Sequence, residues 1–135
     1  EQYYCWRAPV LAPAAGTVVA AVDTFPDNPM GTTDRANPAG NHVAIDHGGG
    51  EYSFLAHFKR GSLVVKPGDK LLAGQLLGLA GNSGNTSEPH LHYHLQDGSA
   101  FPDVESMPAE FRDFIADGLP VARGEPVKGQ RVRPR

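Results

Sequence analysis

Three histidines at alternate positions are the residues of this chain with the clearest chemical potential. His90, His92 and His94 lie within the stretch SEPHLHYHLQDG, residues 87–98. On a strand, side chains at i, i+2 and i+4 share one face, so we expect the three imidazoles to project together. Neutral imidazole is a common zinc ligand, and its ordinary pKa of ~6.5 suits proton transfer near neutral pH. The spacing therefore indicates metal binding or catalysis rather than core packing.

The strand that carries these histidines needs a β-rich core to hold it. With 135 residues, 40% of them hydrophobic and 20% charged, the chain is expected to form one domain across residues 1–135. Sixteen glycines and twelve prolines, against one tryptophan and two methionines, favour short strands joined by turns. The runs GTVVAAVD, NHVAIDH and EYSFLAHF are typical of strands, and GGG between the last two indicates a hairpin. An all-β fold is predicted.

Three segments depart from the pattern of strands and tight turns. Residues 24–40 are dense in Pro, Asn, Asp and Gly and lack a period, which predicts a long loop. Residues 106–118, SMPAEFRDFIADG, predict one short helix with a cap at Ser106 and an apolar stripe that we assign to core packing. Residues 119–135 hold few apolar side chains and are expected to form an extended, solvated tail.

Charge and cysteine content exclude several classes of function. The formal net charge is −3, which gives no basic footprint, so neither nucleic acid nor an anionic membrane surface is an expected partner. No apolar run approaches the ~18 residues of a membrane-spanning helix, and no signal peptide is visible. Cys5 is the only cysteine, which excludes an internal disulfide and a CxxC zinc site.

The stretch GNSGNTSEPHLHYHL resembles the HxH signature of the lysostaphin-type (LytM-type) zinc metallopeptidases, which cleave peptide cross-links of bacterial peptidoglycan. The segments APVLAPAAGTVVAAVD, GNHVAIDHGGGEYSFLAHF and VVKPGDKLLAGQLLGLAGNSG resemble that family's successive core strands in order, over residues 7–98. The resemblance implies an antiparallel β-sandwich with an open groove, of the duplicated hybrid motif or barrel-sandwich type. It also implies zinc as cofactor, peptidoglycan peptides as substrate, and a periplasmic or extracellular place in the cell envelope.

The resemblance implies a separate role for each histidine. His92, the second histidine of HxH, matches the zinc ligand, and His90, the first, matches a catalytic histidine. His57, in LAHF, matches the family's other catalytic histidine. Zinc would polarise the scissile carbonyl, while His57 and His90 would position or deprotonate a water and stabilise the developing oxyanion. His94 falls where relatives carry Glu, Gln or His, so it is either a neighbour of the zinc ligand or part of the groove lining.

One part of the family pattern is absent. The family takes two further zinc ligands from an HxxxD motif ahead of the PVLAP-like segment, and EQYYCWR, residues 1–7, holds neither histidine nor aspartate. A literal HxxxD occurs at His42 and Asp46, but it aligns with a later strand, where we interpret both as exposed polar residues. The open alternatives are an N-terminally truncated peptidase domain and a zinc-less relative that binds and activates cell-wall amidases. The three retained histidines favour the first.

A carrier module is a further alternative. The segment VVKPGDKLLAGQLLG also resembles the turn-strand-turn of biotinyl and lipoyl domains. Those domains need an exposed, modified lysine in a tight hairpin, typically flanked by methionine or acidic residues. Neither Lys66 nor Lys70 has that setting, so we rank this function below the other two.

Overall fold

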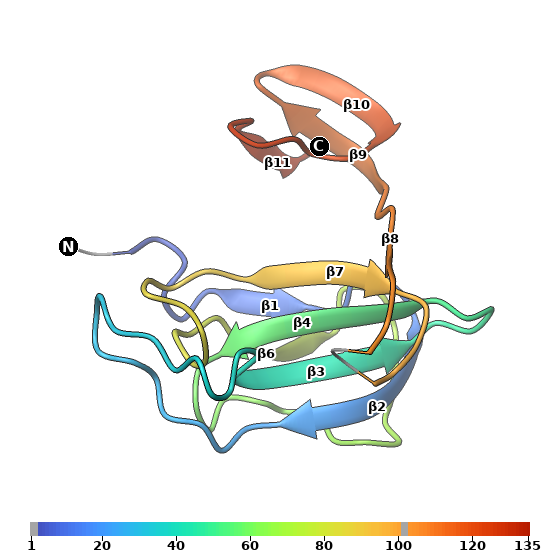
Figure 1. Cartoon of the computed structure of the whole chain (residues 1–135). Coiled ribbons are helices and arrows are strands. Elements are labelled where there is room, and N and C mark those ends of the chain that lie inside the picture. Colours follow the sequence, from blue (N-terminus) through green and yellow to red (C-terminus); the bar gives the residue numbers. More distant parts are fainter. Residues whose placement is uncertain (1–2, 101–102) are drawn as a thin grey trace.

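The computed structural model describes residues 3–100 and 103–135, and every regular element in these ranges is a β-strand (Figure 1). The strands pair antiparallel in three sheets. The predicted all-β class and antiparallel sandwich are therefore confirmed. The strands are β1 (Pro9–Leu11), β2 (Gly16–Val22), β3 (Asn41–Asp46), β4 (Tyr52–Phe58), β5 (Lys70–Leu71), β6 (Leu76–Leu79), β7 (His92–Gln96), β8 (Ser106–Met107), β9 (Phe111–Ala116), β10 (Leu119–Gly124) and β11 (Val132–Pro134).

The sandwich consists of a six-stranded sheet, in the order β5-β2-β3-β4-β7-β8, and a small second layer of β1 paired with β6. Alternate residues of β2, β3 and β4 point between the layers, because successive side chains of a strand face opposite ways. The core that they form with β6 is fully buried and apolar; its members include Val18, Val43, Ile45, Leu55 and Leu77. The other face of β3 and β4 carries Ala44, Phe54 and Ala56, which form a second, smaller cluster.

The hairpin predicted at GGG joins β3 to β4. Gly48, Gly49 and Gly50 have φ values of 84°, 64° and 82°, in the left-handed region that favours glycine. Asp46 Oδ1 accepts a hydrogen bond of 2.7 Å from the Gly48 amide and so fixes the start of the turn. The two central strands of the sheet are therefore set in register by local sequence, as expected.

The short helix predicted at residues 106–118 is wrong. This segment instead forms β8, which pairs with β7, and β9, which pairs with β10. Asp117 and Gly118 both have positive φ, 50° and 86°, which is the geometry of a two-residue hairpin turn. Asp-Gly between apolar residues is the usual sequence for that turn, and it determines the structure here more strongly than the short apolar period does.

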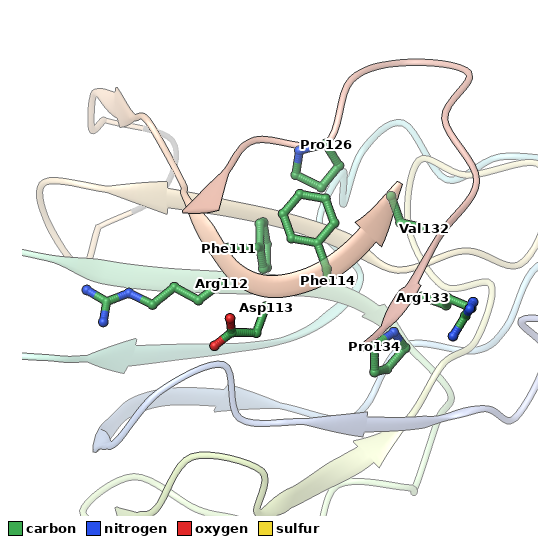
Figure 2. Close-up of a pocket in the computed structure, with 8 residues that line it drawn as sticks. All are labelled: Phe111, Arg112, Asp113, Phe114, Pro126, Val132, Arg133 and Pro134. Atoms are coloured by element: carbon green, nitrogen blue, oxygen red, sulfur yellow. The ribbon is translucent and has the colours of Figure 1, made fainter. Parts of the chain in front are cut away.

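A three-stranded sheet in the order β10-β9-β11 follows the sandwich, joined to it by the segment that contains β8 (Figure 1). Two of its strands come from residues 119–135, which were expected to be an extended tail. Phe114 is buried in this sheet, whereas the Phe111 ring contacts Tyr93 of the sandwich at a centroid distance of 5.6 Å. This sheet carries a pocket of about 440 Å³. Figure 2 shows the residues that line it, among them Phe111 and Phe114. None of the described residues forms a helix that is long and apolar enough to cross a membrane.

Candidate active site

Three of the predicted site residues meet at one end of the six-stranded sheet. His57 lies near the end of β4, His92 begins β7, and His90 precedes it. The His57 ring lies 4.7 Å from the His90 ring and 5.8 Å from the His92 ring, centroid to centroid. His57 and His92 line a pocket of about 200 Å³ whose walls include Asn85. The sequence therefore identified the right residues to place together, and their individual roles stay predictions.

A β-bulge directs His57 into this pocket. In the pairing of β3 with β4, Asn41 opposes Phe58 and His42 opposes Ala56, so His57 is the extra, unpaired residue. Its φ of 66° is uncommon for a residue other than glycine. With regular alternation, the His57 side chain would point into the core on the same side as Leu55. The bulge directs it instead to the opposite face of the sheet, where the pocket lies. Strained backbone of this kind persists only where the surroundings hold it in place.

A buried polar cluster around Asn41 and Ser83 stabilises the bulge at His57. The Ser83 hydroxyl donates to the Phe58 carbonyl at 2.7 Å and accepts from the Asn41 amide at 3.0 Å. The Asn41 side chain also donates to the Phe58 carbonyl, at 3.0 Å, and both side chains are fully buried. A Cβ on Gly40 would lie 2.4 Å from the Ser83 carbonyl carbon, so only glycine lets the two segments approach this closely.

The long loop of residues 24–40 fastens the segment that leads to His90. Asp27 Oδ1 accepts from the Asn82 amide at 2.8 Å, and the Asn28 amide donates to the Asn82 carbonyl at 2.9 Å. The Asn28 side chain donates to two further carbonyls, those of Gly84 and Thr86, at 2.6 and 3.0 Å. The predicted loop thus serves as a support for the strand that carries the histidines.

A hydrogen bond to a backbone carbonyl fixes the protonation pattern of His57, whose Nδ1 lies 2.8 Å from the Ser83 carbonyl. A carbonyl only accepts, so Nδ1 carries the hydrogen and Nε2 holds the free lone pair. His90 Nδ1 lies 3.0 Å from both the Glu88 carbonyl and the Thr86 hydroxyl, and because a hydroxyl can donate or accept, these contacts hold the ring without setting its tautomer. Burial, opposed by the Ser83 bond and reinforced by the neighbouring His90 and His92, lowers the pKa of His57 from 6.5 to about 4. His57 is therefore neutral at neutral pH.

His92 is bonded to His94 rather than to a carbonyl. His92 Nε2 lies 2.9 Å from His94 Nδ1, and His94 Nε2 lies 2.6 Å from Gln96 Oε1. Partial burial of the ring lowers the pKa of His92, and the charges of His94 and His90 act in the same direction. His94 therefore lies beside the candidate zinc ligand and also contacts the Phe54 ring, at 5.2 Å between centroids.

The described residues do not form a complete zinc site. Among residues 3–100 and 103–135, no three side chains of His, Cys, Asp or Glu are arranged to hold a metal ion. His42 and Asp46 share a face of β3, yet four residues of strand separate them by about 13 Å, too far for one ion. His42 Nδ1 is bonded to the Gly40 carbonyl and Asp46 to the β3–β4 turn. A catalytic zinc takes three protein ligands, and of the predicted ligands the described residues include only His92.

Several residues that shape the site were missed from the sequence. The sequence alone does not show that Gly40, Asn41, Asn82 and Ser83 shape the site. Their contacts join segments far apart in the chain, such as Asp27 with Asn82, so no local pattern reveals them. The one available signal was the density of amide, hydroxyl and glycine residues in GNSGNTS.

Comparison with known proteins identifies the family. The model of peptidase family M23 matches residues 5–103, which is most of the chain. The chain belongs to peptidase family M23. The predicted lysostaphin-type (LytM-type) resemblance is thereby confirmed. M23 is a family of zinc metallopeptidases.

Relatives of the M23 domain include enzymes and a protein named as an activator. Peptidoglycan DD-endopeptidase ShyA of Vibrio cholerae serotype O1 is 38% identical over 90 residues, covering 63% of this chain and 20% of ShyA. Murein hydrolase activator EnvC of Escherichia coli is 29% identical over 91 residues, covering 67% of this chain and 20% of EnvC. A zinc-containing peptidase from Vibrio cholerae has a similar structure, with a TM-score of 0.52 and 27% identity over 66% of this chain and 23% of that one. The chain thus spans 20% of the length of each of the two curated relatives.

Proposed function

We propose that this M23 domain is a zinc-dependent endopeptidase that hydrolyses peptide cross-links of bacterial peptidoglycan in the cell envelope, in the periplasm or outside the cell. The observation that carries the proposal is that the rings of His90 and His92 both lie close to the ring of His57, at one end of the sheet. Both rings have Nδ1 tied to a carbonyl, which leaves Nε2 available for chemistry. The likeness to ShyA, a peptidoglycan DD-endopeptidase, supports the substrate class.

The two catalytic histidines suit different parts of amide hydrolysis. Water adds its oxygen to the carbonyl carbon, and one of its protons has to reach the leaving amine nitrogen. His57 is neutral and buried, so its Nε2 lone pair can accept a hydrogen bond from the attacking water and orient it. His90 lies on the exposed side, where its ring can take up the proton that the water loses and pass it to the amine nitrogen. Ala39 and Ala56 line the pocket beside His57, and their small side chains leave room in it for part of a peptide.

Zinc would polarise the carbonyl and activate the water in such an enzyme. Because the described residues supply only His92, we propose that the two further ligands precede Glu1, as in the family pattern. Metal analysis of residues 1–135 beside a longer chain with the residues encoded upstream tests this. Stoichiometric zinc in the longer chain alone supports the proposal, and stoichiometric zinc in residues 1–135 contradicts it.

A second candidate function is a zinc-less module that binds and activates a cell-wall amidase. The incomplete ligand set favours it, together with the likeness to EnvC, a murein hydrolase activator. Absence of zinc from both chains in the metal analysis would favour this function over the first. A carrier function gains no support, because Lys70 lies on β5 and its ammonium group donates to Thr17.

Release of peptides from purified cross-linked peptidoglycan separates the two candidates. The endopeptidase proposal expects fragment release by the zinc-loaded longer chain and its loss in His90→Ala. His47→Gln is the matched control, because His47 bonds to Ala15 and Ser53, outside the pocket. Equal release by the wild type and His90→Ala contradicts the role of His90. Amidase stimulation without fragment release supports the activator.

A further inference from the structure

Gln96 is a fully buried polar residue at the end of β7, on the face that carries His92 and His94. Its amide nitrogen donates to the Gly98 carbonyl at 2.6 Å. Because a carbonyl only accepts, this bond fixes which way the amide points and leaves Oε1 toward His94 Nε2, at 2.6 Å. A buried amide held at both ends has one orientation.

That orientation propagates along the strand. Gln96 Oε1 can only accept, so His94 Nε2 carries the hydrogen and His94 Nδ1 holds a lone pair. The lone pair lies 2.9 Å from His92 Nε2, which must then be the donor. His92 is left with its lone pair on Nδ1. Three side chains at i, i+2 and i+4 thus form one directed chain of hydrogen bonds.

The outcome for His92 is opposite to that for His57. His57 carries the hydrogen on Nδ1, because that nitrogen faces the Ser83 carbonyl, and it holds its lone pair on Nε2. His92 carries the hydrogen on Nε2. The pocket therefore has two kinds of imidazole, distinguished by their hydrogen-bond partners alone.

We propose that Gln96 is a positioning residue that acts through His94 to hold His92 in a single orientation and a single tautomer, with Nδ1 as the nitrogen free to bind a ligand. Its use in hydrolysis rests on the proposed function, whereas the tautomer itself does not. A ligand that takes an imidazole lone pair would meet His92 through Nδ1. Gln96 touches neither the pocket nor a reacting atom.

Nitrogen-15 NMR of histidine-labelled residues 1–135 tests the proposal in the absence of metal and substrate. At about pH 8.5, two units above the ordinary histidine pKa of ~6.5, the neutral tautomers are observed. The wild type should show His92 with the hydrogen on Nε2 and a scalar coupling across the hydrogen bond from His92 Nε2 to His94 Nδ1. A hydrogen on His92 Nδ1, or no such coupling, overturns the proposal. Lack of peptidase activity has no bearing on this readout.

Paired variants separate this role from a merely structural one. Gln96→Leu removes the acceptor, so the coupling should be lost and His94 should populate both tautomers, while Gln96→Glu keeps an acceptor and should keep the coupling. Should the Leu variant fail to fold, His94→Leu and His94→Gln give a second pair, because Gln at this position can accept from His92 and donate to Gln96. His92 should keep its single tautomer only in His94→Gln. A folded Gln96→Leu or His94→Leu protein whose His92 tautomer is as uniform as in the wild type overturns the proposal.

Discussion

The histidine end of the sandwich and the C-terminal sheet are stabilised in different ways. At the histidine end, the polar side chains of Asn41 and Ser83 are fully buried, and their hydrogen bonds connect segments far apart in the chain. In the C-terminal sheet, only Phe114 and Ala116 are buried among the described residues. Backbone pairing alone fixes where a strand runs, whereas buried polar contacts also fix where a side chain points. The candidate site lies at the histidine end, where backbone pairing fixes the strands and buried polar contacts also fix the directions of the side chains.

Replacement of His57 should give the largest effect on function. His57→Asn removes the imidazole with the least disturbance of the backbone, because asparagine tolerates the left-handed conformation that His57 occupies. We expect peptidoglycan hydrolysis by the zinc-loaded longer chain to fall by about 100-fold or more, as for removal of a catalytic acid or base. The melting temperature should change little. Hydrolysis retained within about 10-fold would show that the bulge does not serve catalysis.

Replacement of Gly40 should give the largest effect on stability. Gly40 and Gly49 have similar positive φ values, 56° and 64°, but only at Gly40 would a Cβ meet another part of the chain. Gly40→Ala should therefore cost about 3 kcal/mol, from overpacking added to backbone strain. Gly49→Ala should cost only about 1 kcal/mol. Urea unfolding measures both, and equal costs would mean that the contact of Gly40 with Ser83 adds nothing.

Low pH should decrease the free energy of unfolding of the metal-free protein through His57. Burial lowers the pKa of His57 from 6.5 to about 4, so between these values the unfolded chain binds more protons than the folded one. Stability is then fully present above about pH 6.5 and falls toward pH 4, by at most about 1.4 kcal/mol per pH unit from this group. Urea midpoints at several pH values should show a shallower slope in His57→Asn. An unchanged slope contradicts the assignment to His57.

Loss of Phe114 should give the smallest effect on the sandwich. Phe114→Ala removes the larger of the two buried side chains of the C-terminal sheet, so amide exchange in β9 and β10 should accelerate strongly. The free energy of unfolding of the sandwich should change by about 0.5 kcal/mol or less, because the change is remote from its core. Phe54→Ala is the contrasting variant, since Phe54 packs within the sandwich on the histidine face. A large loss of sandwich stability in Phe114→Ala would mean that the two regions fold together.

Local patterns in the sequence predicted much of the sandwich. Strand runs, the GGG hairpin and the placement of His92 and His94 at alternate positions of a strand were correct, because each depends on residues a few positions apart, whereas His90 lies just before β7. The sandwich itself and the family followed from the ordered resemblance of longer segments. The helix at 106–118 was wrong because a short apolar period fits helix and strand alike, and the Asp117-Gly118 turn was overlooked.

The bulge at His57 could not have been predicted in the same way. Nothing in EYSFLAHF marks an unpaired residue. The bulge depends on Asn41 and Ser83, whose side chains donate hydrogen bonds to the Phe58 carbonyl from other parts of the chain. The same holds for the tautomer of His92, which depends on a carbonyl beyond Gln96. Side-chain direction at this site is a tertiary property.

The attachment of the 24–40 loop to the segment at Asn82 has a consequence for exchanging parts between relatives. Asp27 and Asn28 bond to Asn82, Gly84 and Thr86, so neither piece has a complete set of partners without the other. A chimera that takes one of them from another M23 protein would bring together unmatched donors and acceptors. The two segments should therefore be exchanged together in any chimera that is built to change specificity.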